Sequence, residues 1–122
     1  MSESSTLGRK GEDLALSFLQ NNGYKIRNRN WKAGKLEVDI IAETDKFIVF
    51  VEVKTRSEDF LESPQEAVTN QKQRSLVLAA DTYIRWFDIS KPARFDVITV
   101  IAKGQTLTIE KHIEDAFYPT LR

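Results

Sequence analysis

The sequence predicts a single α/β domain in which helices flank a mixed β-sheet. Apolar residues first recur with helical spacing, and three consecutive stretches rich in β-branched and aromatic residues follow. A second helical pattern then precedes two more such stretches, and no repeat, linker or low-complexity segment divides the chain. The predicted order is therefore αβββαββ, with residues 1–122 in one domain around one core.

Composition narrows the class of protein. The chain is 41% hydrophobic, no apolar run is long enough to cross a bilayer, and the polar start is unlike a signal peptide, so we expect a cytoplasmic protein without membrane contact. Cysteine is absent and histidine occurs once, which excludes thiolate metal sites and favours a hard, oxygen-bound cation over zinc. The 18 basic and 18 acidic residues cancel, so any nucleic-acid surface must be local.

The first helix is predicted from about residue 6 to residue 22, with Gly23 in the position typical after a helix. Glu12 lies at the edge of its apolar stripe. This carboxylate is either a solvated surface group or a ligand that reaches over the sheet, where Gly8 and Gly11 would let the helix approach closely.

The second helix is predicted from residue 64 to about residue 86, with Ser63 and Glu66 forming a capping box. Two apolar strands follow, over residues 94–102 and 106–113, separated by a glycine-containing turn. Both strands belong in the sheet.

The strand predicted over residues 24–31 has a strongly basic face. Cations and aromatic side chains are interspersed between Tyr24 and Lys35, and no acid occurs among them. The cluster consists of Lys25, Arg27, Arg29, Trp31, Lys32 and Lys35. It either neutralises nucleic-acid phosphates, with Trp31 stacking on a base, or protects an edge strand from aggregation.

Carboxylates interrupt the apolar hairpin that flanks the turn 43–46. An even number of residues in the turn places Asp39 opposite Glu52, with Cβ atoms about 5 Å apart. The same parity places Glu37 opposite Lys54, on the same face of the sheet. One lysine cannot neutralise three carboxylates, so the cluster is either an ion-pair ladder with unpaired acids or a site for a divalent cation.

Two further cations accompany this cluster. Arg56 follows the hairpin, and Lys72 lies in the polar middle of the second helix, where it is either solvated or in contact with a phosphate. Arg94 and Asp96 share a strand face, which favours a structural ion pair.

Four large aromatic residues, two at the end of the second helix and two in the tail, suggest a homodimer. Trp86 and Phe87 end the second helix, while Phe117 and Tyr118 lie in the tail 114–122, which we expect to form a short closing helix. These aromatic residues either meet the same patch of a second copy or close the rim of the core.

Asp39 followed by Glu52-Val53-Lys54 resembles the PD-(D/E)xK nuclease superfamily, although the proline of that name is absent here. A series of short motifs between Gly8 and Ile101 is more specific and resembles the bacterial YraN-like family. In order, they are Gly8-Arg9-Lys10-Gly11-Glu12, Asn22-Gly23-Tyr24, Arg29-Asn30-Trp31, Glu37-Val38-Asp39-Ile40-Ile41-Ala42, Val49-Phe50-Val51-Glu52-Val53-Lys54-Thr55-Arg56, Pro64-Gln65-Glu66-Ala67-Val68 and Arg94-Phe95-Asp96-Val97. One departure is Leu36, where the family commonly has glycine.

The resemblance implies a restriction-endonuclease-like fold in the Holliday-junction-resolvase-like branch. It further implies a metal-dependent endonuclease that hydrolyses phosphodiesters of branched or flapped DNA with Mg²⁺ or Mn²⁺. The alternative is a nucleic-acid-binding or partner-binding module that keeps the fold but cleaves little or nothing.

By the same resemblance, Asp39 and Glu52 are the principal metal ligands, with the carbonyl of Val53 beside them and Glu12 as a further carboxylate. Lys54 would orient or deprotonate the attacking water. Glu37 is either a partner of Lys54 or a ligand of a second metal ion. The basic strand, Arg56 and Lys72 would hold the phosphate backbone.

Overall fold

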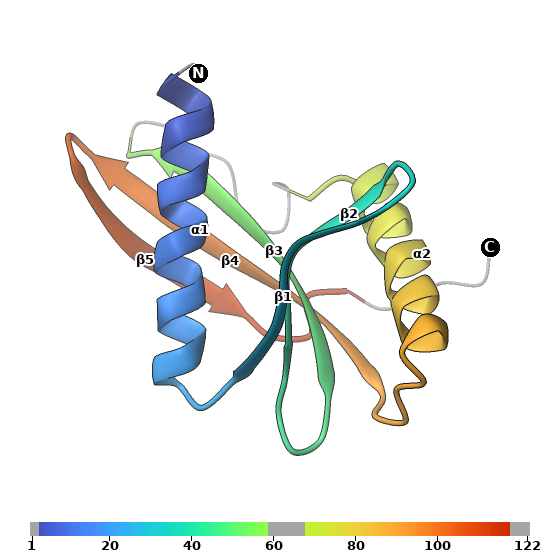
Figure 1. Cartoon of the computed structure of the whole chain (residues 1–122). Coiled ribbons are helices and arrows are strands. Elements are labelled where there is room, and N and C mark those ends of the chain that lie inside the picture. Colours follow the sequence, from blue (N-terminus) through green and yellow to red (C-terminus); the bar gives the residue numbers. More distant parts are fainter. Residues whose placement is uncertain (1–2, 59–67, 118–122) are drawn as a thin grey trace.

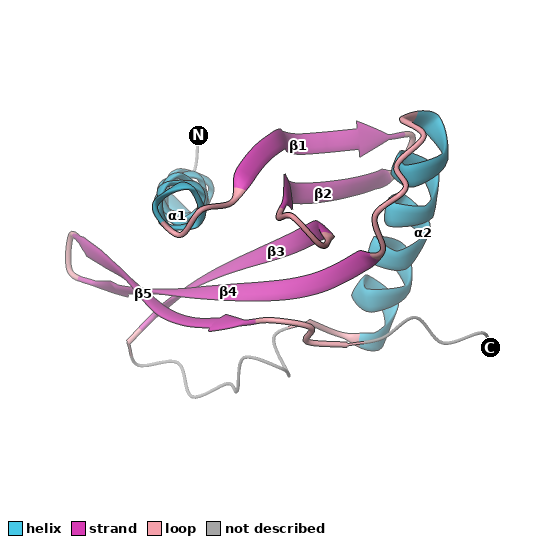
Figure 2. Cartoon of the chain, turned by 90° about the horizontal axis from the view of Figure 1, so that it is seen from below, coloured by secondary structure: helices cyan, strands magenta, loops and turns pink. Residues whose placement is uncertain are grey.

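Two helices lie on opposite faces of one five-stranded sheet in the computed structural model, which describes residues 3–58 and 68–117 (Figures 1 and 2). The helices are α1 (Glu3–Asn21) and α2 (Asn70–Trp86). The strands are β1 (Lys25–Ala33), β2 (Leu36–Glu43), β3 (Ile48–Ser57), β4 (Ala93–Lys103) and β5 (Thr106–Ile113). The predicted αβββαββ order is confirmed.

The sheet is mixed, as predicted. Its strands lie in the order β1-β2-β3-β4-β5, and only β3 and β4 are parallel neighbours. A parallel pair needs a crossover connection, which here includes α2. The first half of β3 and most of β4 are apolar and buried, because helices cover both of their faces.

Each helix has its own core cluster. On the α1 side, Ala15 and Leu19 pack against buried strand residues that include Val51 and Ile98. On the α2 side, Leu76 and Tyr83 pack against Phe50 and other apolar residues. Charged groups on β2 and β3 are therefore the exceptions that require a reason. In the described part of the chain, no helix is long and apolar enough to cross a membrane.

The start of α2 differs from the prediction. Thr69 is extended at φ −66° and ψ 162°, and its hydroxyl accepts a hydrogen bond from the Lys72 N–H at 3.2 Å, so it is the N-cap. A continuous helix from residue 64 is thus wrong, and the predicted capping box lies outside the described residues. The tail is also not helical over residues 114–117, where it forms a turn.

The predicted basic face of β1 is divided by two backbone irregularities. The β1–β2 register skips Arg27, whose Nε donates to the Tyr83 hydroxyl at 2.8 Å on the α2 side. Asn30 has a left-handed φ of 52°. As a result Arg29 lies beside α1, whereas Trp31 packs against Tyr83 of α2. Simple alternation cannot anticipate a bulge.

Gly11 lets α1 approach β3 closely, as the sequence suggested. A Cβ atom at this position would overlap the Thr55 hydroxyl, while one at Gly8 would meet nothing within 4 Å. Only Gly11 is therefore required for the close approach that brings α1 over the charged part of the sheet.

Candidate active site at the fork between β2 and β3

The sheet forks where the predicted carboxylates lie. Pairing between β2 and β3 covers only residues 40–43 with 48–51. Beyond this point β2 remains with β1 as far as Leu36, while β3 remains with β4 as far as Ser57. Figure 1 shows the two strands diverging above their shared turn. Asp39 and Glu52 occupy the position at which they separate.

The turn determines which residues meet at this fork. Thr44 donates its N–H to the Phe47 carbonyl at 2.9 Å, which closes a four-residue turn. The last pair is Ile40 with Val51, so the next residues along this register are Asp39 and Glu52. The turn thus has an even number of residues, the case in which the sequence predicts that Asp39 lies opposite Glu52. The predicted pairing of Glu37 with Lys54 does not form, because the strands have already parted; Glu37 pairs with Lys32 instead.

The Asp39 side chain compensates for the lost strand pairing. Its Oδ2 accepts a hydrogen bond from the Val53 N–H at 2.9 Å. In an extended strand, the N–H and C=O of one residue point to the same side, so the Val53 carbonyl faces the fork as well. The fork thus collects two carboxyl groups and one backbone carbonyl, all of them oxygen donors.

The Asp39–Glu52 pair favours binding of a proton near neutral pH, because the pKa values of both carboxyl groups are raised. Their carboxyl groups are hydrogen-bonded to each other. Burial, and then the nearby charge of Asp39, raises the pKa of Glu52 to about 8, and burial raises the pKa of Asp39. The Glu52 Oε1 atom is buried without a hydrogen-bond partner among the described residues. Such a pair favours a cation that would replace the proton.

The cation nearest to this pair is not the one that the sequence emphasised. Lys72 Nζ, from the first turn of α2, lies 3.8 Å from Glu52 Oε1. Lys54 is exposed on the strand beside Thr99, and its charge acts to lower the pKa of Glu52. Lys72 was expected on a phosphate; its approach to Glu52 depends on the packing of α2, for which the local sequence has no signal.

Two more carboxylates surround the fork. Burial, followed by the charge of Asp39, raises the pKa of Glu12, and Asn30 donates a hydrogen bond to it. Arg29 Nη2 lies 3.7 Å from Glu12 Oε1. Glu37 is exposed, and its charge raises the pKa of both Asp39 and Glu12. The structure therefore brings all of the predicted carboxylates into one electrostatic neighbourhood.

The donor set suits a hard divalent cation such as Mg²⁺ or Mn²⁺. Asp39, Glu52 and the Val53 carbonyl supply only oxygen, which these ions prefer. Within residues 3–58 and 68–117, no group of three or more acidic, histidine or cysteine side chains is arranged to hold a metal ion. The protein would thus supply two carboxylates and a carbonyl, and water or phosphate oxygens would have to complete the coordination.

The predicted phosphate-binding residues fall into two groups. Arg27 pairs with Glu43 at 3.1 Å, Arg29 with Asp13 at 2.6 Å, and Arg56 donates to both carboxylate oxygens of Glu110. These guanidinium groups connect elements of the fold. By contrast, Lys25, Lys32 and Lys35 are exposed, and Trp31 is half-buried. The second group is the one available to a ligand.

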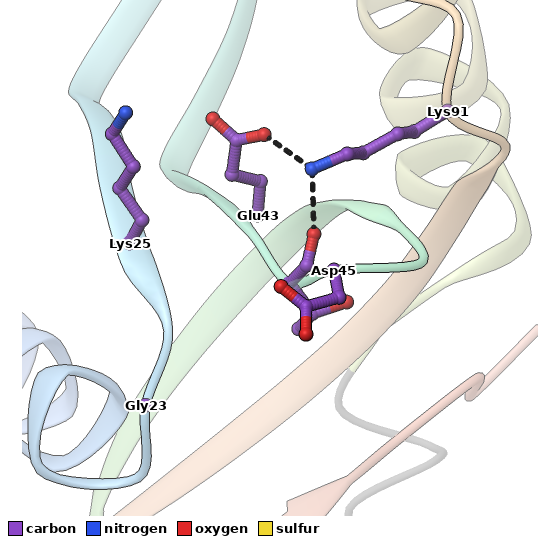
Figure 3. A pocket seen from close by; sticks show the side chains of 6 residues that line it. Gly23, Lys25, Glu43, Asp45 and Lys91 are labelled. Atoms are coloured by element: carbon purple, nitrogen blue, oxygen red, sulfur yellow. Dashed lines mark hydrogen bonds and ion pairs between the residues drawn. The ribbon is translucent and has the colours of Figure 1, made fainter.

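A separate pocket of about 240 Å³ lies near the opposite end of β2, beside the turn (Figure 3). Lys91 Nζ binds Glu43 and the Thr44 carbonyl, both at 2.8 Å, and Lys25 extends beside them (Figure 3). The carboxylate of Glu43 is therefore already neutralised. The fork, with its excess of acidic groups, is the better candidate site.

A buried carboxylate elsewhere shows what a structural ion pair looks like in this protein. Asp96 is completely buried and accepts hydrogen bonds from Arg94, the Asp115 N–H and His112, whose Nε2 is 2.7 Å away. Burial acts to raise the pKa of Asp96, but the hydrogen bonds from His112 and Arg94 outweigh it and lower this pKa. The predicted Arg94–Asp96 pair is confirmed, whereas His112, approaching from β5, was missed.

The fold and the fork together define a single-domain α/β protein with a five-stranded mixed sheet and a paired-carboxylate site. The model of the Uncharacterised protein family UPF0102 matches residues 11–100. The chain belongs to this family, which confirms the resemblance to the YraN-like proteins.

Relatives extend over the whole chain. A UPF0102 protein of Bacteroides fragilis is 51% identical over 121 residues, which cover 99% of each chain. UPF0102 proteins of Parabacteroides distasonis and Phocaeicola vulgatus are 47% and 43% identical, over 100% and 99% of each chain. Their names state no activity, so any function must be argued from the site.

Proposed function

We propose that this protein is a metal-dependent nuclease whose active site is the fork between β2 and β3. The observation that carries the proposal is the partly buried Asp39–Glu52 pair, in which both pKa values are raised and Glu52 Oε1 has no hydrogen-bond partner in the described structure. Asp96 demonstrates that this fold neutralises a purely structural carboxylate with several donors. Among the described residues of the fork, Asp39 accepts from the Val53 N–H, and Glu52 has Lys72 no closer than 3.8 Å.

Asp39, Glu52 and the Val53 carbonyl would hold Mg²⁺ or Mn²⁺. Such an ion, when bound, polarises a phosphate oxygen and makes bound water more acidic. Lys72, 3.8 Å from Glu52, would neutralise a phosphate oxygen at the fork. Lys54, exposed on the same strand, would orient the attacking water. Glu12 would accept a hydrogen bond from a water at the α1 side of the fork.

The substrate that we propose is DNA with a branch or flap. Exposed Lys25, Lys32 and Lys35 lie along β1 and its turn, beside the fork-forming strand β2. Their positive charge suits a phosphate backbone that approaches from this edge of the sheet. This preference for branched DNA comes from the resemblance to resolvase-like nucleases, and a nuclease acting on DNA would work in the cytoplasm.

A binding module is the second candidate. It is favoured by the small donor set at the fork, where the described residues supply two carboxylates and a carbonyl. Such a module would grip nucleic acid through the exposed lysines without hydrolysis.

Incubation with labelled duplex, flap, four-way and single-stranded DNA, with Mg²⁺, Mn²⁺ or chelator, separates these functions. The nuclease proposal predicts metal-dependent products from at least one branched substrate, and their loss in Asp39→Asn. Asp45→Asn, which removes an exposed carboxylate from the turn at the other end of β2, is the matched control and should keep activity. Binding without products under every metal condition would favour the module.

The homodimer stays a prediction. Phe117 stacks on Phe95 at 5.2 Å within the chain, and Tyr118 lies outside the described residues. Trp86 and Phe87 remain exposed. Sedimentation at micromolar concentration is the test.

A further inference from the structure

The two tryptophans of the chain form a partly exposed pair on the α2 side. Trp31 and Trp86 have ring centroids 5.8 Å apart and are inclined by 74°, in an edge-to-face arrangement. Trp31 is supported by Tyr83, whose ring centroid is 5.2 Å away. Trp86 is 64% exposed, although an indole ring is among the most favourable groups to bury. Trp86 is therefore an accessible aromatic ring that is held in place by Trp31 and, through it, by Tyr83. A ring of this kind can stack on a flat ligand.

The tryptophan pair adjoins the fork. Trp31 on β1 pairs with Val38 on β2, and Val38 directly precedes Asp39. Trp86 ends the same helix that presents Lys72 to Glu52, about 21 Å along the helix axis from it. A strand that lies across the tryptophan pair can therefore continue along α2 and β2 toward the carboxylates.

Cations lie beside the pair. Lys32 follows Trp31 on the opposite face of β1, across from Glu37, and Lys35 lies in the β1–β2 turn; both are exposed, and neither forms an ion pair with the part of the chain that the structure describes. Arg27 places its guanidinium 5.6 Å from the centre of the Tyr83 ring, beneath the pair. Exposed aromatic surface with lysines at the nearby end of β1 complements a nucleic-acid strand, in which bases alternate with phosphates.

We propose that the Trp31–Trp86 pair stacks on an unpaired base of a single-stranded segment, which the neighbouring lysines hold by its phosphates. This inference deepens the proposed function and rests on it, because it assigns a single-stranded segment to the substrate of the fork. Bases within a duplex are already stacked on each other and are not free to stack on a tryptophan ring. The inference therefore selects flapped or single-stranded substrates over continuous duplex.

A second copy of the chain is a less suitable occupant. The centre of a protein interface is depleted of lysine, whereas Lys32 and Lys35 are exposed at the end of β1 near the pair. The other large exposed apolar residues of the described chain, Leu78 and Phe87, are 58% and 48% exposed. Phe87 also contacts Tyr83, with ring centroids 4.5 Å apart, so a second copy of the chain is the alternative occupant that the experiment must distinguish.

Intrinsic fluorescence tests the inference without any cleavage, because both tryptophans of the protein belong to the pair. Titration of wild-type protein in chelator with a short oligothymidylate should quench the tryptophan emission, and blunt duplex of equal length should quench it much less. Trp86→Ala should weaken oligothymidylate binding, measured by anisotropy of labelled DNA, about 5- to 150-fold. Leu78→Ala, an exposed position on the same helix, should leave it unchanged.

Three results would overturn the inference: oligothymidylate binding without quenching, equal quenching by blunt duplex, or unaltered affinity in Trp86→Ala. An emission shift on dilution without DNA, accompanied by dimers in sedimentation, would assign the surface to a second copy and also overturn it. Failure here is distinguishable from failure of the nuclease proposal. The latter is measured by metal-dependent products in the Asp39→Asn comparison, which do not depend on fluorescence.

Discussion

Replacing Glu52 with glutamine should make the protein more stable at alkaline pH. The pKa of Glu52 is about 8 in the folded protein, against an ordinary value of 4.5. Between these two values, the native state holds a proton that the unfolded state has released. The free energy of unfolding must therefore fall as the pH rises through this window, and become independent of Glu52 above it. Glu52→Gln is neutral at every pH and lacks this loss.

The magnitude follows from the same linkage. Each pH unit across which only the native state is protonated corresponds to about 1.4 kcal/mol. The Glu52 side chain is 13% exposed, so little screening by solvent is expected. Over the whole window, the loss of stability is at most about 5 kcal/mol, and the variant should exceed the wild type at pH 8 by roughly 2–5 kcal/mol. At pH 5 the two proteins should be nearly equal.

Urea unfolding from pH 5 to pH 9, in chelator, measures this difference. Glu43→Gln is the control. Hydrogen bonding to Lys91 and Arg27 lowers the pKa of Glu43, so this carboxylate is ionised in both states above pH 6. Glu43→Gln should therefore lower the free energy of unfolding by the same amount at every pH in that range. Parallel curves for the wild type and Glu52→Gln would refute the shared-proton account of the fork.

Other positions test the structural framework. Gly11→Ala should cost about 1–3 kcal/mol in urea unfolding, since its Cβ would overlap the Thr55 hydroxyl, and Gly8→Ala should cost far less. Tyr83→Phe removes the hydroxyl that accepts from Arg27 and donates to Asn28, and should destabilise by about 1–3 kcal/mol; an unchanged midpoint would contradict the role of this bond in the β1 bulge. Asp96→Ala leaves Arg94 and His112 without their buried partner and should cost about 3–5 kcal/mol, whereas a loss below 1 kcal/mol would be inconsistent with this network.

The order of the helices and strands, and the meeting of Asp39 with Glu52, could be predicted from hydrophobic periodicity and the number of residues in the turn. Buried residues recur with a spacing that distinguishes helix from strand, so the element order could be predicted. The even turn brought Asp39 and Glu52 together because the side-chain period of a strand is two. The excess of carboxylates then pointed to a cation site.

Features that depend on the third dimension could not be predicted. Arg27 leaves the β1–β2 register and Asn30 adopts a left-handed backbone, so the basic residues of β1 separate onto two faces. Lys72 reaches Glu52 because α2 begins after Thr69, which places its first turn beside β3. His112 meets Asp96 through pairing of β4 with β5, at a separation of 16 residues. None of these contacts has a periodic signal.

Calorimetric titration with Mn²⁺ at pH 7, in two buffers of different ionisation enthalpy, tests the central claim most directly, because it counts protons released as the ion binds. If Asp39 and Glu52 share a proton that a divalent cation replaces, binding should release about one proton per ion, and Asp39→Asn should abolish the binding. Absence of binding in the wild type, or binding without proton release, would contradict the assignment of the fork as a metal site.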